Sequence, residues 1–336
     1  KHRYYYKLLL KLNCNGFAIS SSFLISFYNF YRKRFVRPVI REEITMEDLV
    51  RLAKIQSELT PADITISVVI PNYNYERFMY QRLYSILSQH QKLNEIIILD
   101  DCSTDDSRKL ITEIVDKLSP YINIRKVYNE TNSGSAFKQW QKGFSLAKSD
   151  YVWIAEADDY CSEDLLDYLV KPLKKYNDVM ISYSDTAFID VFGNITLKSI
   201  KSEIDIQKSG HWNKSYVNDG LSEIKDYSYL NCTIANVSSC LIKNGDYNKY
   251  LEKSGSYKQA GDWLFYVNIM RKGKIAYCNK ALNYYRVHGN NVSSTMNRKK
   301  HIAEINKIHS YYCKEFDLDE HHKEMMQKRV DFLKEC

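Results

Sequence analysis

Hydrophobic positions in the middle of the chain follow two alternating patterns. Four short apolar runs, rich in β-branched residues, have the length of buried strands: 64–70, 95–99, 122–128 and 152–155. Each run is followed by apolar residues at helical spacing, beginning with Met79, Leu83 and Ile86 after the first. Such strand-then-helix units predict an α/β fold with a mostly parallel sheet, right-handed crossovers and flanking helices, in the Rossmann-like class.

The pattern changes on either side of this region. Residues 46–59 predict a helix, 179–189 a further strand, and 274–285 a pair of strands, whereas 190–260 has the irregular, polar character of binding loops. We therefore expect three parts: a basic helical N-terminal extension at 1–62, an α/β domain at 63–295 and a C-terminal helical tail at 296–336.

Acidic residues follow two of the predicted strands. Asp100 and Asp101 end the second strand, and Glu156, Asp158 and Asp159 follow the fourth. Open α/β folds bind ligands at the carboxyl ends of their strands, and we expect these two strands to be neighbours in the sheet. Because carboxylates so close together repel one another, a divalent cation among them would explain the cluster. A solvated acidic turn that caps the next helix is the alternative.

Charge is distributed unevenly. The formal net charge of the chain is +7, and residues 1–41 alone hold nine Lys or Arg and no acid. A basic arm with Tyr and Phe suits an anionic membrane surface, nucleic acid or packing against the protein itself, and nucleic acid fits this arm least well. No apolar run reaches the ~18 residues that a membrane-spanning helix needs. We expect a cytoplasmic protein without a nucleic-acid partner, and peripheral contact of residues 1–41 with the inner membrane face is one alternative.

The cysteines add one constraint on the environment of the protein. The chain has eight of them and no CxxC pair. This spacing indicates reduced thiols rather than a zinc site or a disulfide framework.

Successive segments of the chain resemble the signatures of family 2 glycosyltransferases. They are SVVIPNYN (67–74), LDDCSTDDS (99–107), NSGSAF (132–137) and AEADD (155–159), with GDW (261–263) and YRVHGNNVS (285–293) further on. The resemblance implies the GT-A fold and inverting transfer from a nucleotide sugar, with UDP as the expected nucleotide. It also implies a glycan or lipid-linked glycan acceptor in bacterial surface-polysaccharide assembly. Processive members carry a QxxRW motif and transmembrane helices, which this sequence lacks, so single additions are favoured.

The resemblance also assigns roles to residues of the donor site. Pro71 and Tyr73 close the first strand, where Tyr73 would pack against the nucleotide base and Asp101 would hydrogen-bond to it. The alternatives are a turn aromatic and a helix cap. Asp158 and Asp159 resemble the DxD site, in which one acid contacts the ribose and the other coordinates Mn²⁺ or Mg²⁺. Glu156 stands where the usual motif has its first Asp, which leaves open the acid that holds the metal.

Further roles come from the later segments. His288 matches a histidine that reaches the metal or the diphosphate, and Asp262 matches the general base. Inverting transfer needs such a carboxylate on the sugar face opposite the diphosphate. Asp262 could equally cap a helix, and Trp263 could be a core anchor or a platform for a sugar ring. Lys138 is a weaker candidate for the diphosphate, because the family more often has an Arg in this segment.

Two other functions are compatible with parts of the sequence. A sugar nucleotidyltransferase also uses metal-binding acids on an α/β sheet, but PNYNYERF replaces its GxGxR-type opening after the first strand. A non-catalytic glycan-binding or scaffold protein derived from the same fold is the second. The presence of Asp262 together with Asp158 and Asp159 argues against it.

Overall fold

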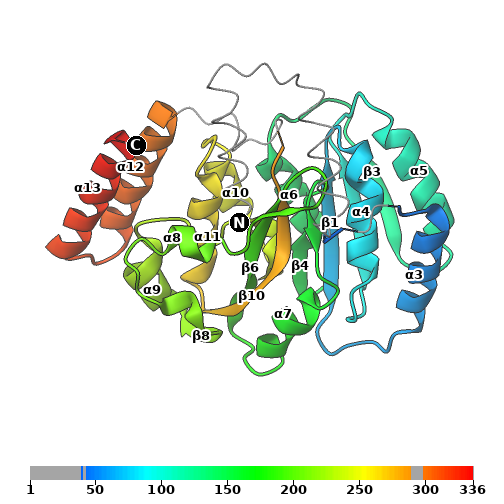
Figure 1. Cartoon of the computed structure of the whole chain (residues 1–336), viewed down its shortest axis with the longest axis horizontal. Coiled ribbons are helices and arrows are strands. Elements are labelled where there is room, and N and C mark those ends of the chain that lie inside the picture. The colour runs from blue at the N-terminus through cyan, green and yellow to red at the C-terminus, as the bar shows by residue number, and fades with distance from the viewer. Residues whose placement is uncertain (1–38, 41–42, 289–297, 336) are drawn as a thin grey trace, which may run out of the picture. The chain divides into compact units, whose positions relative to one another are not determined.

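The computed structural model describes residues 39–40, 43–288 and 298–335 (Figure 1). One compact unit begins at Ile40 and includes both the helix at 46–58 and the C-terminal helices. The expected boundaries at 62 and 295 therefore do not separate compact units. Most of the basic arm, residues 1–38, lies outside the described residues, and the expected membrane contact of 1–41 therefore stays a prediction.

Four parallel strands form one half of a mixed sheet (Figure 1). They lie in the order β3 (Ile124–Tyr128), β2 (Glu95–Asp100), β1 (Ile66–Asn72) and β4 (Tyr151–Ile154). The helices that follow them are α4 (Glu76–Leu87), α5 (Ser107–Leu118), α6 (Ala136–Leu146) and α7 (Leu165–Leu173). The predicted α/β class is confirmed. The expectation that the second and fourth strands are neighbours is wrong, because β1 pairs with both.

The other half of the sheet mixes both directions. β9 (Cys240–Lys243) runs antiparallel between β4 and β6 (Val179–Ile189), and β10 (Lys274–Arg286) is parallel to β6. The expected strand pair at 274–285 is therefore wrong: it is one strand with register shifts around Cys278 and Ala281. Short antiparallel strands complete the sheet: β5 (Tyr160–Cys161), β7 (Ile195–Leu197) and β8 (Tyr216–Asp219).

The helices outside the four repeated units include several short ones within 190–260. In chain order the α-helices are α3 (Met46–Glu58), α8 (Lys201–Ile204), α9 (Gly220–Glu223), α10 (Asn248–Ser254), α11 (Gly261–Met270), α12 (Arg298–Glu315) and α13 (Glu320–Glu335). Single turns at His211–Asn213, Ile224–Ser228 and Val237–Ser239 lie between them.

Alternate residues of the strands enter two separate hydrophobic clusters, because successive side chains of a strand point to opposite faces. Val68 and Ile70 of β1 belong to a cluster that includes residues of α3, α4, α5 and α7. Val69, between them, belongs to a second cluster that includes residues of α6, α11, α12 and α13. Each fully buried aliphatic side chain contributes about 1.5–3 kcal/mol of transfer free energy. Both faces of the central strands are thus covered, which leaves the strand ends as the place for polar chemistry.

Candidate active site

The loops after β1 and β2 are joined by a network of hydrogen bonds around Asp100. This fully buried carboxylate accepts from Asn72 Nδ2 at 2.9 Å and from Arg108 Nε at 2.8 Å. Burial alone would raise the pKa of Asp100, but the hydrogen bonds from Arg108 and Ser103 outweigh it and lower that pKa. Asp100 therefore fixes the shape of the two loops and remains ionised.

Asp101 lies beside this network and holds a third loop. Its carboxylate accepts from Asn129 Nδ2 at 2.6 Å, from Ser133 N at 2.9 Å and from Ser133 Oγ at 2.7 Å. Because α5 begins only at Ser107, Asp101 is not its cap. The structure thus places Asp101 at the carboxyl end of β2, in contact with the 129–135 segment that leads into α6.

Pro71 and Tyr73 lie at the end of β1 with opposite exposures. Pro71 is buried in the strand, whereas the Tyr73 side chain is 43% exposed. Asn74 follows at a positive φ of 59°, and its Oδ1 accepts from Thr104 N at 2.7 Å. Tyr73 is therefore an open aromatic surface on a loop that is fastened to the loop containing Asp101.

Asp158 and His288 meet although 130 residues separate them in the chain. Asp158 Oδ2 lies 2.9 Å from His288 Nε2, and both residues are buried. The His288 ring packs edge-on against Tyr75, with centroids 5.5 Å apart, and also contacts Phe78. Sequence reasoning missed Tyr75, whose pKa is raised by burial and by the charges of Asp158, Glu156 and Asp159.

Asp159 is buried beside Asp158, but other partners take up its oxygen atoms. Oδ2 accepts from Ser238 Oγ at 2.6 Å and from Asn236 Nδ2 at 2.9 Å, and Oδ1 accepts from Arg286 N at 3.2 Å. Burial and the neighbouring Asp158 raise the pKa of Asp159 to about 6. The structure therefore gives Asp159 a bracing role between β4, the 236–238 turn and β10.

Glu156 completes the acidic group after β4. Its Oε1 accepts from Trp140 Nε1 at 2.7 Å, and its backbone N–H donates to Ser238 Oγ at 3.1 Å. Burial and the Asp158 charge raise the pKa of Glu156 to about 8, although the buried Arg82 opposes the rise. Three acids thus lie together in a buried, low-dielectric environment, where a cation would stabilise their ionised forms.

Asp262 lies in the first turn of α11, where its Oδ1 accepts from Trp263 N at 2.8 Å. Its charge adds to burial in raising the pKa of Cys232 and of Cys240. Burial raises the pKa of Asp262 itself to about 6. Tyr266, one turn further along α11, experiences the charges of both Asp262 and Glu156, again after burial. The Phe265 ring of α11 lies 5.9 Å from the ring of Trp140, which donates to Glu156, so α11 packs beside the acidic group that follows β4.

The structure also gives the contacts of Trp263 and Lys138. Trp263 is buried, and its Nε1 donates to Ser228 O at 2.8 Å and to Tyr312 Oη at 3.0 Å. It is a core anchor and not a sugar platform, because no ring face is exposed. Lys138 Nζ contacts Ser133 O at 3.4 Å, in the loop that Asp101 holds.

The donor atoms of Asp158 and His288 fit a divalent cation. A carboxylate oxygen and an imidazole nitrogen 2.9 Å apart are ligands that Mn²⁺ accepts, whereas Mg²⁺ prefers oxygen alone. Asp159 does not add a third ligand atom to this pair in its present hydrogen-bonded position. The raised pKa values of Glu156 and Asp159 are consistent with the same fit, since a cation would favour their ionised forms.

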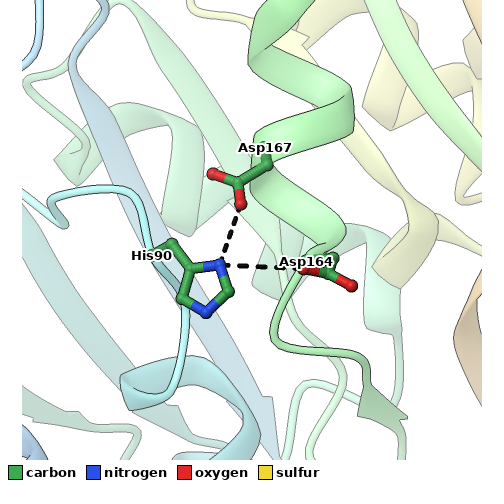
Figure 2. A group of neighbouring side chains, drawn as sticks. All are labelled: His90, Asp164 and Asp167. Carbon is green, nitrogen blue, oxygen red and sulfur yellow. Dashed lines mark hydrogen bonds and ion pairs between the residues drawn. The ribbon is translucent and has the colours of Figure 1, made fainter.

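A second group of metal-ligating side chains lies elsewhere (Figure 2). His90, Asp164 and Asp167 are the only three His, Cys, Asp or Glu in the described parts of the chain whose ligand atoms all lie within 4.8 Å of one another. His90 Nδ1 is 2.9 Å from Asp167 and 3.7 Å from Asp164, and the hydrogen bond to Asp167 raises the His90 pKa. This surface ion pair precedes the amino end of β2, away from the strand ends that carry the predicted site.

Comparison with known proteins identifies the class. The mostly parallel sheet with flanking helices matches the GT-A fold of its structural neighbours. The glycosyl transferase family 2 model matches residues 67–231. The chain belongs to this family.

Curated relatives agree with the family assignment. An uncharacterized glycosyltransferase of Haemophilus influenzae is 31% identical over 42% of this chain and 54% of its own length. The E. coli UDP-Glc:alpha-D-GlcNAc-diphosphoundecaprenol beta-1,3-glucosyltransferase WfaP is 27% identical over 68% of this chain and 80% of its own length. The chain spans about half the length of the Haemophilus influenzae relative, and 38% and 32% of the length of two other relatives.

Solved structures share the fold. Staphylococcus aureus TarS 1–349 in complex with UDP-GlcNAc is 18% identical, with a TM-score of 0.57 over 80% of this chain and 72% of that one. The mannosyltransferase PcManGT from Pyrobaculum calidifontis, in complex with GDP-Man and Mn²⁺, has 15% identity and a TM-score of 0.54 over 86% and 81%. Among the described residues, no helix combines the length and apolar character that crossing a membrane requires.

Replacement of Ser238 by Ala tests the hydrogen-bond network of the site. The variant loses the donor to Asp159 and the acceptor for Glu156 N–H, so we expect a loss of about 1–3 kcal/mol in the free energy of unfolding. Ser239→Ala is the matched control, because this equally buried neighbour donates mainly to a backbone carbonyl. Urea unfolding of both variants measures the difference. An equal or larger loss in the Ser239 variant would contradict the network.

Proposed function

We propose that the chain is a metal-dependent, inverting glycosyltransferase that adds single sugars from a UDP-linked donor to a glycan or lipid-linked glycan acceptor in surface-polysaccharide assembly. One arrangement carries the proposal: the buried Asp158–His288 pair lies after β4, and α11, whose first turn holds Asp262, packs against Trp140, which bonds Glu156 of the same acidic group. A donor diphosphate at the first and an acceptor hydroxyl near Asp262 would then share one site.

The nucleotide is assigned to the ends of β1 and β2. The exposed Tyr73 ring offers a stacking surface for a base, and Asp101 offers carboxylate oxygens at the neighbouring strand end. Asp101 already has three donors, so base recognition would use a remaining lone pair or displace Ser133 Oγ. The choice of UDP is supported by the UDP-Glc in the name of one relative and the UDP-GlcNAc bound to one structural neighbour.

The diphosphate is assigned to Asp158 and His288, which would hold Mn²⁺ or Mg²⁺. A bound divalent cation would neutralise the negative charge that develops on the leaving diphosphate. The chain contributes the geometry: Tyr75 and Phe78 hold the His288 ring, and Arg286 Nε donates to Asp158 O at 2.7 Å. Asp159 keeps β4 and β10 together through the 236–238 turn rather than binding the ligand directly.

Asp262 is assigned as the general base. A carboxylate with a pKa near 6 is mostly ionised at neutral pH and accepts a proton more readily than one with an ordinary pKa. It would take the proton of the acceptor hydroxyl as that oxygen attacks the anomeric carbon from the face opposite the diphosphate. The acceptor itself is proposed from relatives that act on surface glycans, among them the TarS poly(ribitol-phosphate) beta-N-acetylglucosaminyltransferase. We also propose a cytoplasmic location, with membrane contact of residues 1–41 as an added possibility for a lipid-linked acceptor.

Replacement of Asp262 by Asn tests the base. With Mn²⁺ and UDP-glucose or UDP-GlcNAc, we expect UDP release to fall about 10²- to 10⁴-fold, while UDP binding stays unchanged. Wild-type turnover should decline as the pH falls through about 6, because protonated Asp262 cannot accept a proton, and the variant should lose this dependence. Asp246→Asn is the matched control, an exposed acid that accepts a backbone N–H before α10. Full turnover in the Asp262 variant would contradict the assignment.

Metal removal tests the donor side. UDP should raise the melting temperature only when Mn²⁺ is present, by the equivalent of about 2.7 kcal/mol at about 100 times Kd. Asp158→Asn should abolish this stabilisation. Asp167→Asn, in the surface group with His90, should leave it intact. Stabilisation that persists after chelation, or that depends on Asp167 instead, would show that the metal site is misplaced.

A further inference from the structure

We propose that Glu304, on the C-terminal helix α12, is a positioning residue that sets the place of Asp262 for proton transfer. The inference rests on the proposed function, because it gives Asp262 the role of base. It assigns part of the catalytic geometry to a segment that the sequence pattern marks only as an amphipathic tail.

Glu304 binds three successive backbone N–H groups just before α11. Its Oε1 accepts from Lys258 N at 2.7 Å, and its Oε2 accepts from Gln259 N at 2.8 Å and from Ala260 N at 3.0 Å. Glu304 is only 9% exposed, so these bonds form largely away from water. Bonds to an ionised acceptor are about twice as strong as neutral ones, and three of them converge here on one carboxylate.

The N-cap position of α11 has no side chain that could replace this carboxylate. Ala260, at the N-cap position, has no side chain that can accept a hydrogen bond. The first N–H groups of a helix need an acceptor, and a negative charge beside them is favourable. Within α11, Asp262 Oδ1 accepts from Trp263 N. Glu304 instead binds the N–H groups up to the N-cap Ala260 and places a negative charge beside the start of the helix, two residues before Asp262.

Asp262 has little freedom to adjust if this anchor is lost. A Cβ on Gly261 would lie 2.4 Å from Ser254 O and 2.8 Å from the Phe137 ring, so the backbone is closely packed on that side. On the other side Trp263 Nε1 donates to Tyr312 Oη of α12, and His309 packs edge-on against the Trp263 ring. Asp262 thus lies between Gly261, which packs closely against Ser254 and Phe137, and Trp263, which α12 holds in place. A misplacement of about 1 Å at such a position lowers rates by about 10²-fold.

Glu304 also contributes to the electrostatic environment of Asp262. Burial is the main cause of the raised Asp262 pKa, and the charge of Glu304 adds to it. The other titratable groups near Asp262 are Cys232, Cys240 and Tyr266, all of them buried or partly buried and with a raised pKa. Removal of the Glu304 charge should therefore lower the Asp262 pKa, whereas a purely structural brace would leave it unchanged.

Glu304→Gln tests the proposal, with Glu304→Asp as the conservative variant and Glu315→Gln as the matched control. Glu315 lies on the same helix and pairs with Arg271 at the far end of α11, at 3.1 Å and partly exposed. We expect amide hydrogen exchange at 258–262 to become at least tenfold faster in Glu304→Gln and to stay unchanged in Glu315→Gln. This measurement needs no substrate, so it distinguishes the anchor from the proposed function.

Turnover provides the second readout. With Mn²⁺ and UDP-glucose or UDP-GlcNAc, kcat of Glu304→Gln should fall at least tenfold at an unchanged KM for the donor. The acid limb of its pH profile, where kcat declines as the pH falls, should lie at a lower pH than in the wild type. Glu304→Asp should recover part of kcat, because it keeps the charge on a shorter side chain. Unchanged exchange at 258–262 would overturn the anchor, and faster exchange with unchanged kcat and acid limb would overturn the positioning role. No wild-type turnover would count against the proposed function, and with it against this role for Glu304, while the exchange result would still decide the anchor.

Discussion

The burial of carboxylates at the strand ends is the constraint on which the rest of the site depends. An ionised carboxylate loses several kcal/mol of hydration when it is buried, so each one needs donors or a cation. Asp100 obtains them from Arg108, Asn72 and Ser103, and Asp159 from Ser238, Asn236 and Arg286 N–H. Because those donors come from different strands and loops, satisfying the acids also fastens these strands and loops to one another.

The same principle applies at the start of α11, which carries Asp262, where the buried acid is Glu304 of α12. Glu304 accepts hydrogen bonds from the backbone N–H groups just before α11. Tyr312 Oη and Trp263 Nε1 both donate to Ser228 O. α12 therefore belongs to the core that carries Asp262 and not to a separate tail. The two halves of the site meet at Trp140 of α6, which donates to Glu156 and packs against Phe265 of α11.

Sequence reasoning predicted what local periodicity determines. Family resemblance grouped His288 with Asp158 and Asp159 without naming the acid that it contacts, while the strand-then-helix repeat and the acids at strand ends followed from spacing. The place of β1 between β2 and β4 did not, because strand order depends on pairing between distant segments. Ser238, Asn236 and Glu304 were missed for the same reason: an Asn and a Ser in an irregular stretch, or a Glu on an amphipathic helix, give no local signal of a buried partner. Trp263 was left open between core and ligand, and only its contacts with Ser228 and Tyr312 decide for the core.

The central claim is that a metal-bound diphosphate and a base face each other across one cleft. A crystal structure of the chain with UDP and Mn²⁺, with the metal located by its anomalous signal, tests it most directly. The account predicts Mn²⁺ bound to Asp158 and His288, uracil between Tyr73 and Asp101, and Asp262 facing the terminal phosphate across the cleft. An anomalous peak only at His90, Asp164 and Asp167, or a nucleotide bound away from the ends of β1 and β2, would contradict it.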